Sequence, residues 1–229
     1  MSHIRYVRQK LFVENSSVLK IVKKNKTPFY LYSERQLKEN YLNFTKGFSK
    51  VKPLVCFATK ANTNLNILKT LAKIGSGADV VSGGELLKAI KAGIKPSQIV
   101  FSGVGKTEEE LKLAINKKIL LINVESESEA ILINKIASRN NRKVSIGFRL
   151  NPNVDAKTHK KISTGMAENK FGLSIKNFRN FHKNIKDLKN LKLNAISVHI
   201  GSQILSEAPY KKTLNILEKI IKDLKIKPL

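Results

Sequence analysis

Apolar and polar positions alternate in blocks along most of this chain. Short, nearly uninterrupted apolar runs predict strands at residues 54–59, 78–82, 99–102, 120–124, 144–151 and 195–201. Segments with apolar residues three and four positions apart fill the gaps, and they predict helices at 64–74, 84–92, 107–116, 126–139, 174–186 and 210–224. Residues suited to helix N-caps precede three of these helices: Thr107, Ser126 and Ser174.

The segment before the first predicted strand has its own pattern. After a lead segment, Pro28 introduces the apolar run 29–32, and Ser33 then stands as the N-cap of a further helix. Leu37 and Tyr41 lie four positions apart on one face of that helix.

Six alternations of strand and helix predict an α/β protein with a parallel sheet covered by helices, either doubly wound or closed into an eightfold barrel. Polar residues decide between the two, because they stand at or just after the C-terminal ends of successive strands: Lys60, Asp79, Ser82, Ser102, Glu125, Arg149, Asn151 and His199. In a barrel these ends converge on one mouth, whereas an open sheet would scatter them. No Gly-x-Gly-x-x-Gly follows the first strand, so a dinucleotide-binding sheet has no support. We therefore predict a TIM-type (β/α)8 barrel with about six of its β/α units present.

Composition narrows the setting of this fold. With 229 residues, 41% of them hydrophobic, the chain is long enough to bury a sizeable core. The single cysteine, Cys56, excludes an internal disulfide framework, and its place in an apolar run predicts a buried thiol in a reducing compartment. Neither a secretory signal nor an apolar run of membrane-spanning length is visible. These features predict a cytoplasmic protein with no membrane partner.

The net charge of +26 raises the possibility of a nucleic-acid-binding protein, because such a potential attracts polyanions. Lysines account for 36 of the 43 basic residues and are spread over every predicted helix, whereas nucleic-acid-binding surfaces gather their positive charge. Tryptophan is absent, and only seven arginines occur. We expect no nucleic-acid partner, and a basic nucleic-acid-binding protein remains the alternative from another class.

Lys60 is the strongest candidate for chemistry. An apolar run delivers it to a strand end just before a helix, where partial burial would favour the unprotonated amine that attacks an aldehyde. The plainer interpretation is a solvated surface charge. His199 is likewise open to two interpretations, a core histidine or, with Gly201 close behind it, a ring that faces a ligand. Ser202 could bind a phosphate or cap a loop, and charged residues at strand ends could equally form structural ion pairs.

Six motifs in one order resemble the N-terminal barrel of the diaminopimelate decarboxylase family, whose pyridoxal-phosphate barrel is shared with alanine racemase and ornithine decarboxylase. The similarity covers nearly the whole chain. The motifs are Phe-Ala-Thr-Lys-Ala-Asn at 57–62, Asp-Val-Val-Ser-Gly-Gly-Glu-Leu at 79–86, Phe-Ser-Gly-Val-Gly-Lys at 101–106, Arg-Leu-Asn-Pro-Asn-Val-Asp at 149–155, the loop 159–172 with Ile-Ser-Thr-Gly and Asn-Lys-Phe-Gly, and His-Ile-Gly-Ser-Gln at 199–203.

This resemblance implies roles for residues of this chain. Lys60 would hold pyridoxal phosphate as a Schiff base and His199 would stack on its ring, and both would be catalytic. The other cofactor-binding residues would be Asp79, Glu85, Arg149 and Ser202. A substrate loop would contain His159, Ser163 and Thr164, and no metal site is expected.

The implied reaction is decarboxylation of meso-2,6-diaminopimelate to L-lysine and CO2, the last step of lysine biosynthesis. Alternatives within the class are a decarboxylase of ornithine, arginine or carboxynorspermidine, or a non-enzymatic pyridoxal-phosphate-binding protein.

The resemblance also predicts that the chain is an N-terminal fragment. It ends before the family's glycine-rich phosphate loop, and the C-terminal β-domain would be absent. Residues 1–27 would form a segment that packs on that domain, and residues 28–229 would form an incomplete pyridoxal-phosphate-binding barrel. The full-length protein would be a homodimer, and the fragment alone is expected to be inactive.

Overall fold

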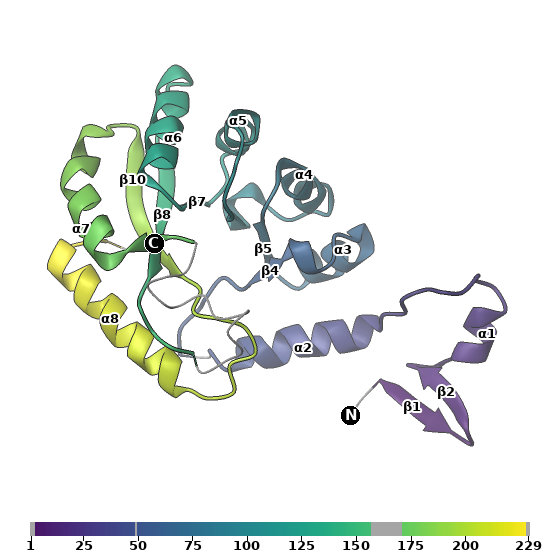
Figure 1. Ribbon diagram of the computed structural model, residues 1–229. Coiled ribbons are helices and arrows are strands. Elements are labelled where there is room, and N and C mark those ends of the chain that lie inside the picture. Colours follow the sequence, from purple (N-terminus) through teal and green to yellow (C-terminus); the bar gives the residue numbers. More distant parts are fainter. Residues whose placement is uncertain (1–2, 49, 157–170, 228–229) are drawn as a thin grey trace.

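The computed structural model describes residues 3–48, 50–156 and 171–227 (Figure 1). Its first part is a small antiparallel sheet of β1 (Ile4–Val7), β2 (Lys10–Val13) and β3 (Ser16–Ser17), followed by α1 (Val18–Val22). We predicted no element in this segment. In Figure 1 it lies at one end of the molecule, beyond the N-terminus of α2 (Glu34–Lys46). The predicted N-cap of α2 is confirmed, because the Ser33 hydroxyl accepts a hydrogen bond from the backbone N–H of Gln36 at 3.0 Å.

The main sheet is parallel, and its strands follow one another in space as they do in the chain. In this order they are β4 (Cys56–Ala58), β5 (Gly77–Val80), β6 (Ile99–Phe101), β7 (Leu121–Val124), β8 (Val144–Asn151) and β10 (Leu191–Val198), while β9 (Leu173–Ser174) pairs with the end of β8. A doubly wound sheet would reverse its order at a switch point, and this order shows no reversal. The predicted partial barrel is confirmed.

Helices cover the outside of this curved sheet. In Figure 1, α3 to α7 form an arc around the strands, and α8 lies beside α7. Arg179 of α7 and Asp223 of α8 form an ion pair at 2.6 Å. The bounds of the helices are α3 Leu65–Lys73, α4 Gly83–Lys91, α5 Glu108–Lys117, α6 Glu127–Arg139, α7 Ile175–Asn184 and α8 Ala208–Leu224. Thr107, Ser126 and Ser174 are N-caps as predicted, and Thr107 forms a complete capping box with Glu110.

The first and last strands differ most from the prediction, whereas the bounds of β5, β6 and β7 differ by one or two residues. The first predicted strand, 54–59, is regular only at β4, and a 3-10 turn, η1 (Thr59–Ala61), begins at the last residue of that predicted strand. The last predicted strand, 195–201, begins earlier, at Leu191, and ends at Val198. Two further 3-10 turns, η2 (Pro96–Gln98) and η4 (Ile185–Asp187), precede β6 and follow α7.

Apolar side chains fill the space between the sheet and its helices. Phe148 of β8 contacts Phe178 and Phe181 of α7, with ring centroids 5.6 and 5.2 Å apart, and all three rings are buried. This packing fixes α7 against the sheet. None of the helices in the described part of the chain is long and apolar enough to cross a bilayer.

Candidate active site

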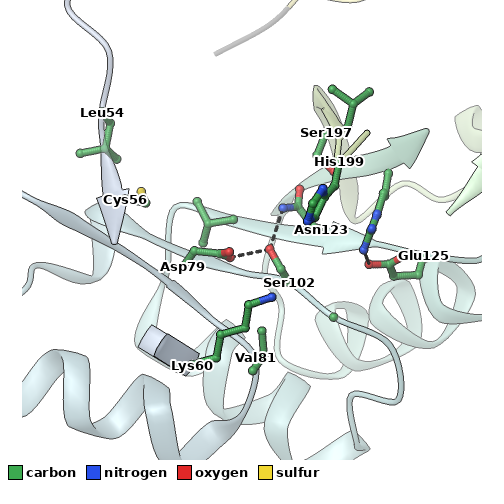
Figure 2. A pocket seen from close by; sticks show the side chains of 14 residues that line it. Leu54, Cys56, Lys60, Asp79, Val81, Ser102, Asn123, Glu125, Ser197 and His199 are labelled. Atoms are coloured by element: carbon green, nitrogen blue, oxygen red, sulfur yellow. Dashed lines mark hydrogen bonds and ion pairs between the residues drawn. The ribbon is translucent and has the colours of Figure 1, made fainter. Parts of the chain in front are cut away.

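A cavity of about 640 Å³ lies at the C-terminal ends of the parallel strands. Its polar lining residues are Lys60, Asp79, Ser102, Asn123, Glu125, Arg149, Ser197 and His199. Figure 2 labels all of these except Arg149. The predicted convergence of strand ends on one mouth is therefore observed. Two members of the predicted set have other places, since Ser82 caps α4 and the Asn151 side chain accepts a hydrogen bond from Asn153 N–H.

Lys60 lies in the turn η1 directly after β4, and Figure 2 shows its side chain directed toward Asp79 and Ser102. Lys60 is exposed, so the described residues do not supply the burial that we expected there. The turn itself is fixed by its buried neighbour Thr59, whose hydroxyl contacts the Asp79 carbonyl at 3.0 Å and the carboxylate of Glu85. The same Glu85 oxygen accepts the backbone N–H of Val81 at 3.0 Å. Glu85 thus stabilises the turn η1, which carries Lys60.

Asp79 is half-buried in the wall of the cavity. The Ser102 hydroxyl donates a hydrogen bond to Asp79 Oδ1 at 2.5 Å. Burial raises the pKa of Asp79 above its ordinary value, while this hydrogen bond and then the charge of Lys60 act in the opposite direction. A carboxylate here would place a negative charge beside the Lys60 amine.

Arg149 is held by a buried acid. Its Nη1 lies 3.2 Å from Glu125 Oε1, and the two side chains are 17% and 6% exposed. The guanidinium also stacks over the Phe171 ring at 5.3 Å. Gly172 has φ +79°, and a Cβ built on it would lie 2.7 Å from the Arg149 carbonyl oxygen. Only glycine therefore allows this close approach of the two chain segments. The result is a cation fixed in the cavity wall.

His199 follows β10 and lines the same cavity. Burial, and then the charges of Arg149 and Lys60, lower the pKa of His199 below its ordinary value. The backbone N–H of Gly201 donates to Nδ1 at 3.3 Å, which requires that this nitrogen carry no proton. The site therefore presents a neutral, flat imidazole at neutral pH.

Comparison with known proteins identifies the family of this chain. The model of the family described as "Pyridoxal-dependent decarboxylase, pyridoxal binding domain" matches residues 34–227. The chain belongs to this decarboxylase family.

Three members of the pyridoxal-dependent decarboxylases illustrate the similarity. Diaminopimelate decarboxylase of Helicobacter pylori strain J99 is 47% identical over 199 residues, covering 87% of this chain and 49% of the relative. That of Aquifex aeolicus is 42% identical over 219 residues, covering 96% and 51%. A crystal structure of the Helicobacter pylori enzyme complexed with L-lysine superposes with a TM-score of 0.88 at 43% identity, covering 92% of this chain and 54% of that one. The chain spans about half the length of the relatives it matches.

Within this decarboxylase fold, Lys60, Asp79, Arg149 and His199 line the cavity, as the sequence predicted for a common site. Glu85 and Ser202 are not among the residues described as lining it; Glu85 lies behind the lysine turn, and Ser202 is exposed on the loop after β10. The predicted substrate-loop residues lie outside the described part of the chain: His159, Ser163 and Thr164. Among the described residues, no group of three or more His, Cys, Asp or Glu side chains could hold a metal ion.

Sequence reasoning missed Asn123, which lines the cavity, and Lys106, which binds the Asn123 carbonyl oxygen. Lys106 has a side chain only 1% exposed, and its Nζ donates to the carbonyl oxygens of Gly103 and Asn123 at 2.6 and 2.7 Å and to Glu129 at 2.7 Å. These bonds tie the loop after β6 to the end of β7 and the start of α6. A lysine that ends a glycine-containing turn was the available signal, but 35 other lysines obscured it.

Pyridoxal phosphate is the cofactor of this family, and the residues present fit it. Lys60 offers a primary amine at the rim of the cavity, and His199 offers a flat neutral ring of the kind that stacks on a pyridine. Arg149 provides a fixed cation in the wall, and Asp79 provides a carboxyl group. The volume of about 640 Å³ lies within the roughly 300–1,000 Å³ of small-molecule and cofactor sites.

Proposed function

We propose that this chain supplies the cofactor-binding half of a pyridoxal-phosphate-dependent decarboxylase that converts meso-2,6-diaminopimelate to L-lysine and CO2. The observation that carries the proposal is the position of Lys60 at the mouth of a cavity walled by Asp79, Arg149 and His199, in a chain of this family. Relatives at 42% and 47% identity are diaminopimelate decarboxylases, and one solved relative holds L-lysine, the product of this reaction.

In the proposed site Lys60 holds the cofactor through its amine. When bound, pyridoxal phosphate supplies an electron sink for the charge left on the α-carbon as CO2 departs. His199, kept neutral, would face the cofactor ring without adding a positive charge to the site. The ion pair with Glu125 holds the Arg149 guanidinium in one position, so the site has a fixed positive charge. Glu85 would act by holding the lysine turn in place, since its carboxylate binds Thr59 and Val81.

The remaining assignments belong to the same proposal. Ser202 would bind the cofactor phosphate from the loop after β10, and the substrate loop would include His159, Ser163 and Thr164. In an enzyme of the relatives' length, residues 28–229 would form part of the barrel and residues 1–27 would pack on a C-terminal β-domain. Exposed apolar side chains in the first segment support this contact, among them Ile4, Tyr6 and Leu19, which are 51%, 73% and 58% exposed. Such an enzyme would be a cytoplasmic homodimer.

Cofactor attachment can be tested on this chain directly. The chain is incubated with pyridoxal phosphate near equimolar ratio, reduced with borohydride, and digested for peptide mass spectrometry. We expect the pyridoxyl group on the peptide containing Lys60, and its loss in Lys60→Arg but not in Lys88→Arg, a nearby lysine bound to the Thr63 hydroxyl. Label spread evenly over the 36 lysines would contradict the proposed site.

The reaction requires a separate test in an enzyme of full length. Residues 34–227 of this chain would replace the matching segment of the Helicobacter pylori enzyme, and lysine formed from meso-diaminopimelate would be measured. We expect activity in this chimera and its loss in the same chimera carrying Lys60→Arg. A folded chimera that binds the cofactor but decarboxylates ornithine or arginine in preference would overturn the substrate assignment.

A further inference from the structure

Three polar side chains from neighbouring strands form a chain of hydrogen bonds across the floor of the cavity (Figure 2). Asp79 lies on β5, Ser102 directly follows β6, and Asn123 lies on β7. The Asn123 amide Nδ2 is 3.0 Å from Ser102 Oγ, and Ser102 Oγ is 2.5 Å from Asp79 Oδ1. The strands pair side by side, so the parallel sheet itself sets the spacing of this chain.

The hydrogen-bonding capacities of the three groups give this chain one direction. An ionised carboxylate only accepts hydrogen bonds, so the single hydroxyl hydrogen of Ser102 must be the one donated to Asp79. The Ser102 oxygen is then free only to accept, and the amide NH2 of Asn123 supplies the donor. If Asp79 were protonated and donated to Ser102, the serine proton would need another acceptor, which the NH2 of Asn123 is not. A proton on Asp79 Oδ2 would leave the Ser102 hydrogen bond in place, but a hydroxyl binds an ionised carboxylate more strongly than a neutral acid. The chain of bonds therefore excludes a proton on Oδ1 and favours the ionised carboxylate.

Asn123 is held in place independently of Asp79. It is only 9% exposed, and its backbone carbonyl oxygen accepts a hydrogen bond from the buried Lys106 Nζ at 2.7 Å. On the adjacent strand β8, Gly147 leaves room for the Asn123 side chain, because a Cβ at Gly147 would lie 2.9 Å from Asn123 Oδ1. These contacts hold the Asn123 side chain beside Ser102, although its buried Oδ1 has no hydrogen-bond partner among the described residues. Burial strengthens the hydrogen bond that its Nδ2 donates to Ser102.

We propose that Ser102 and Asn123 are positioning residues that hold the Asp79 carboxylate ionised and oriented beside Lys60. Burial alone opposes this state, since it raises the pKa of Asp79, and the Ser102 hydrogen bond is the first influence that counteracts it. The charged and titratable groups that face Asp79 from the surrounding elements are Cys56, Lys60, Glu85, Arg149 and His199. The importance of this charge for decarboxylation rests on the proposed function; the charge state itself does not.

The test is a titration of Asp79 in the 229-residue chain without cofactor. The sequence contains four aspartates, Asp79, Asp155, Asp187 and Asp223, so labelling with carboxyl-13C aspartate gives four NMR signals. The signal lost in Asp79→Asn assigns Asp79. Its midpoint is then followed against pH in Ser102→Ala, Ser102→Thr and Asn123→Ala, with Ser197→Ala as the matched control, because Ser197 lines the same cavity outside this chain of bonds.

We expect Ser102→Ala to move the Asp79 midpoint to higher pH, Asn123→Ala to move it in the same direction by less, and Ser102→Thr, which keeps the hydroxyl, to restore it. Ser197→Ala should leave it unchanged. A midpoint in Ser102→Ala equal to that of the control would overturn the proposal, and so would an equal rise in all the variants, which would indicate a general loss of packing. If Ser102→Ala does not fold, the test rests on Asn123→Ala alone. A higher Asp79 midpoint in that variant supports the proposal, and an unchanged Asp79 midpoint refutes it. Borohydride labelling of Lys60 is measured separately, so failure of the proposed function and failure of this inference are distinguished.

Discussion

Replacing Lys106 with methionine removes the ammonium group that joins three parts of the site while keeping most of the side chain's length. The Lys106 side chain is 1% exposed, and its Nζ satisfies two backbone carbonyl oxygens and one oxygen of Glu129 at 2.6 to 2.7 Å. Glu129 is 13% exposed on its side chain, so water reaches it poorly. The variant therefore leaves an almost buried carboxylate without its cation.

The expected loss of stability follows from this burial. Removing one partner of a buried ion pair costs about 3–5 kcal/mol, because the other charge stays desolvated. Glu129 keeps one hydrogen bond, from the backbone N–H of Glu125 at 2.8 Å, and it lies in the first turn of α6, where the helix dipole favours a negative charge. The lower end of the range, about 3 kcal/mol, is the appropriate expectation. It is a large part of the roughly 5–15 kcal/mol that holds a typical domain folded.

The assay is urea unfolding followed by circular dichroism at 222 nm and 25 °C. With a slope of about 2 kcal/mol per molar urea, a loss of about 3 kcal/mol lowers the midpoint by roughly 1.5 M. Lys222→Met is the matched control, since Lys222 and Glu218 form an ion pair at 2.6 Å with side chains 73% and 63% exposed. An exposed pair of this kind contributes about 0.3–0.5 kcal/mol.

The two lysines differ in burial and in the two backbone carbonyl oxygens that Lys106 also binds. Equal losses in Lys106→Met and Lys222→Met would therefore refute the reasoning. A second variant sharpens the test. Replacing Glu129 by glutamine in the Lys106→Met background removes the stranded charge, and it should recover part of the stability. A further loss in that double variant would show that the carboxylate was not the source of the cost.

Three further predictions follow from contacts in and around the cavity. Gly147→Ala would bring a Cβ within 2.9 Å of Asn123 Oδ1 and 3.0 Å of Ala195 Cβ, so we expect a loss of about 1–3 kcal/mol in urea unfolding; a neutral substitution would contradict this packing. Burial, and then the charge of Asp79, raises the pKa of Cys56 to about 11, so iodoacetamide should alkylate it at pH 8 more than about 100-fold more slowly than an unstructured cysteine, and the rate should keep rising to about pH 11; equal rates at pH 8 would show that the thiol is not shielded. His199 has a lowered pKa, so the unfolded chain binds its proton more readily: its contribution to stability is present above about pH 6.5 and is lost as the pH falls through the lower folded pKa. Its ring-proton NMR signal should titrate below the ordinary value, and a midpoint at or above that value would refute the assignment.

Local signals made most of the fold predictable. The alternation of apolar runs with helical patterns gave the parallel strands, and the N-cap of α5 at Thr107 followed from a hydroxyl just before three glutamates. Lys60, Asp79, Arg149 and His199 could be placed together because parallel strands bring their C-terminal ends to one edge. The small sheet of residues 4–17 could not be predicted, since strands of two to four residues carry too few positions to show a period.

Other features depend on contacts between segments far apart in the chain. The residues next to Lys106 in the sequence do not distinguish it from the other 35 lysines. Its hydrogen-bond acceptors belong to residues 103, 123 and 129, two of which are far from it in the chain. Glu85 was predicted among the cofactor-binding residues, yet its carboxylate turns to Thr59 and Val81. A spacing within one motif tells which residues are near in the chain, and the direction in which a helical side chain points depends on the packing around it.

The late start predicted for β10 has a structural cause that also explains the site. Leu193 pairs with Ile146, and Ala195 pairs with Gly147, so Asn194 is an extra residue that shifts the register. Without this bulge Ile196 would stand opposite Arg149; with it Ile196 pairs with Phe148 in the core, and Ser197 pairs with Arg149.

One buried residue thus exchanges the two faces of the strand. Before the bulge, Leu191 and Leu193 pack on the core with the two-residue spacing of a regular strand. After it, the next core residue is Ile196, which is three positions beyond Leu193. A strict alternation of apolar and polar residues is broken at this point, so a search for period two finds only the second half of the strand. The same interruption delivers Ser197 to the cavity wall beside Arg149, ahead of His199 at the strand end. The irregularity that hid the start of β10 is therefore part of what builds the site, as expected for bulges next to functional cavities.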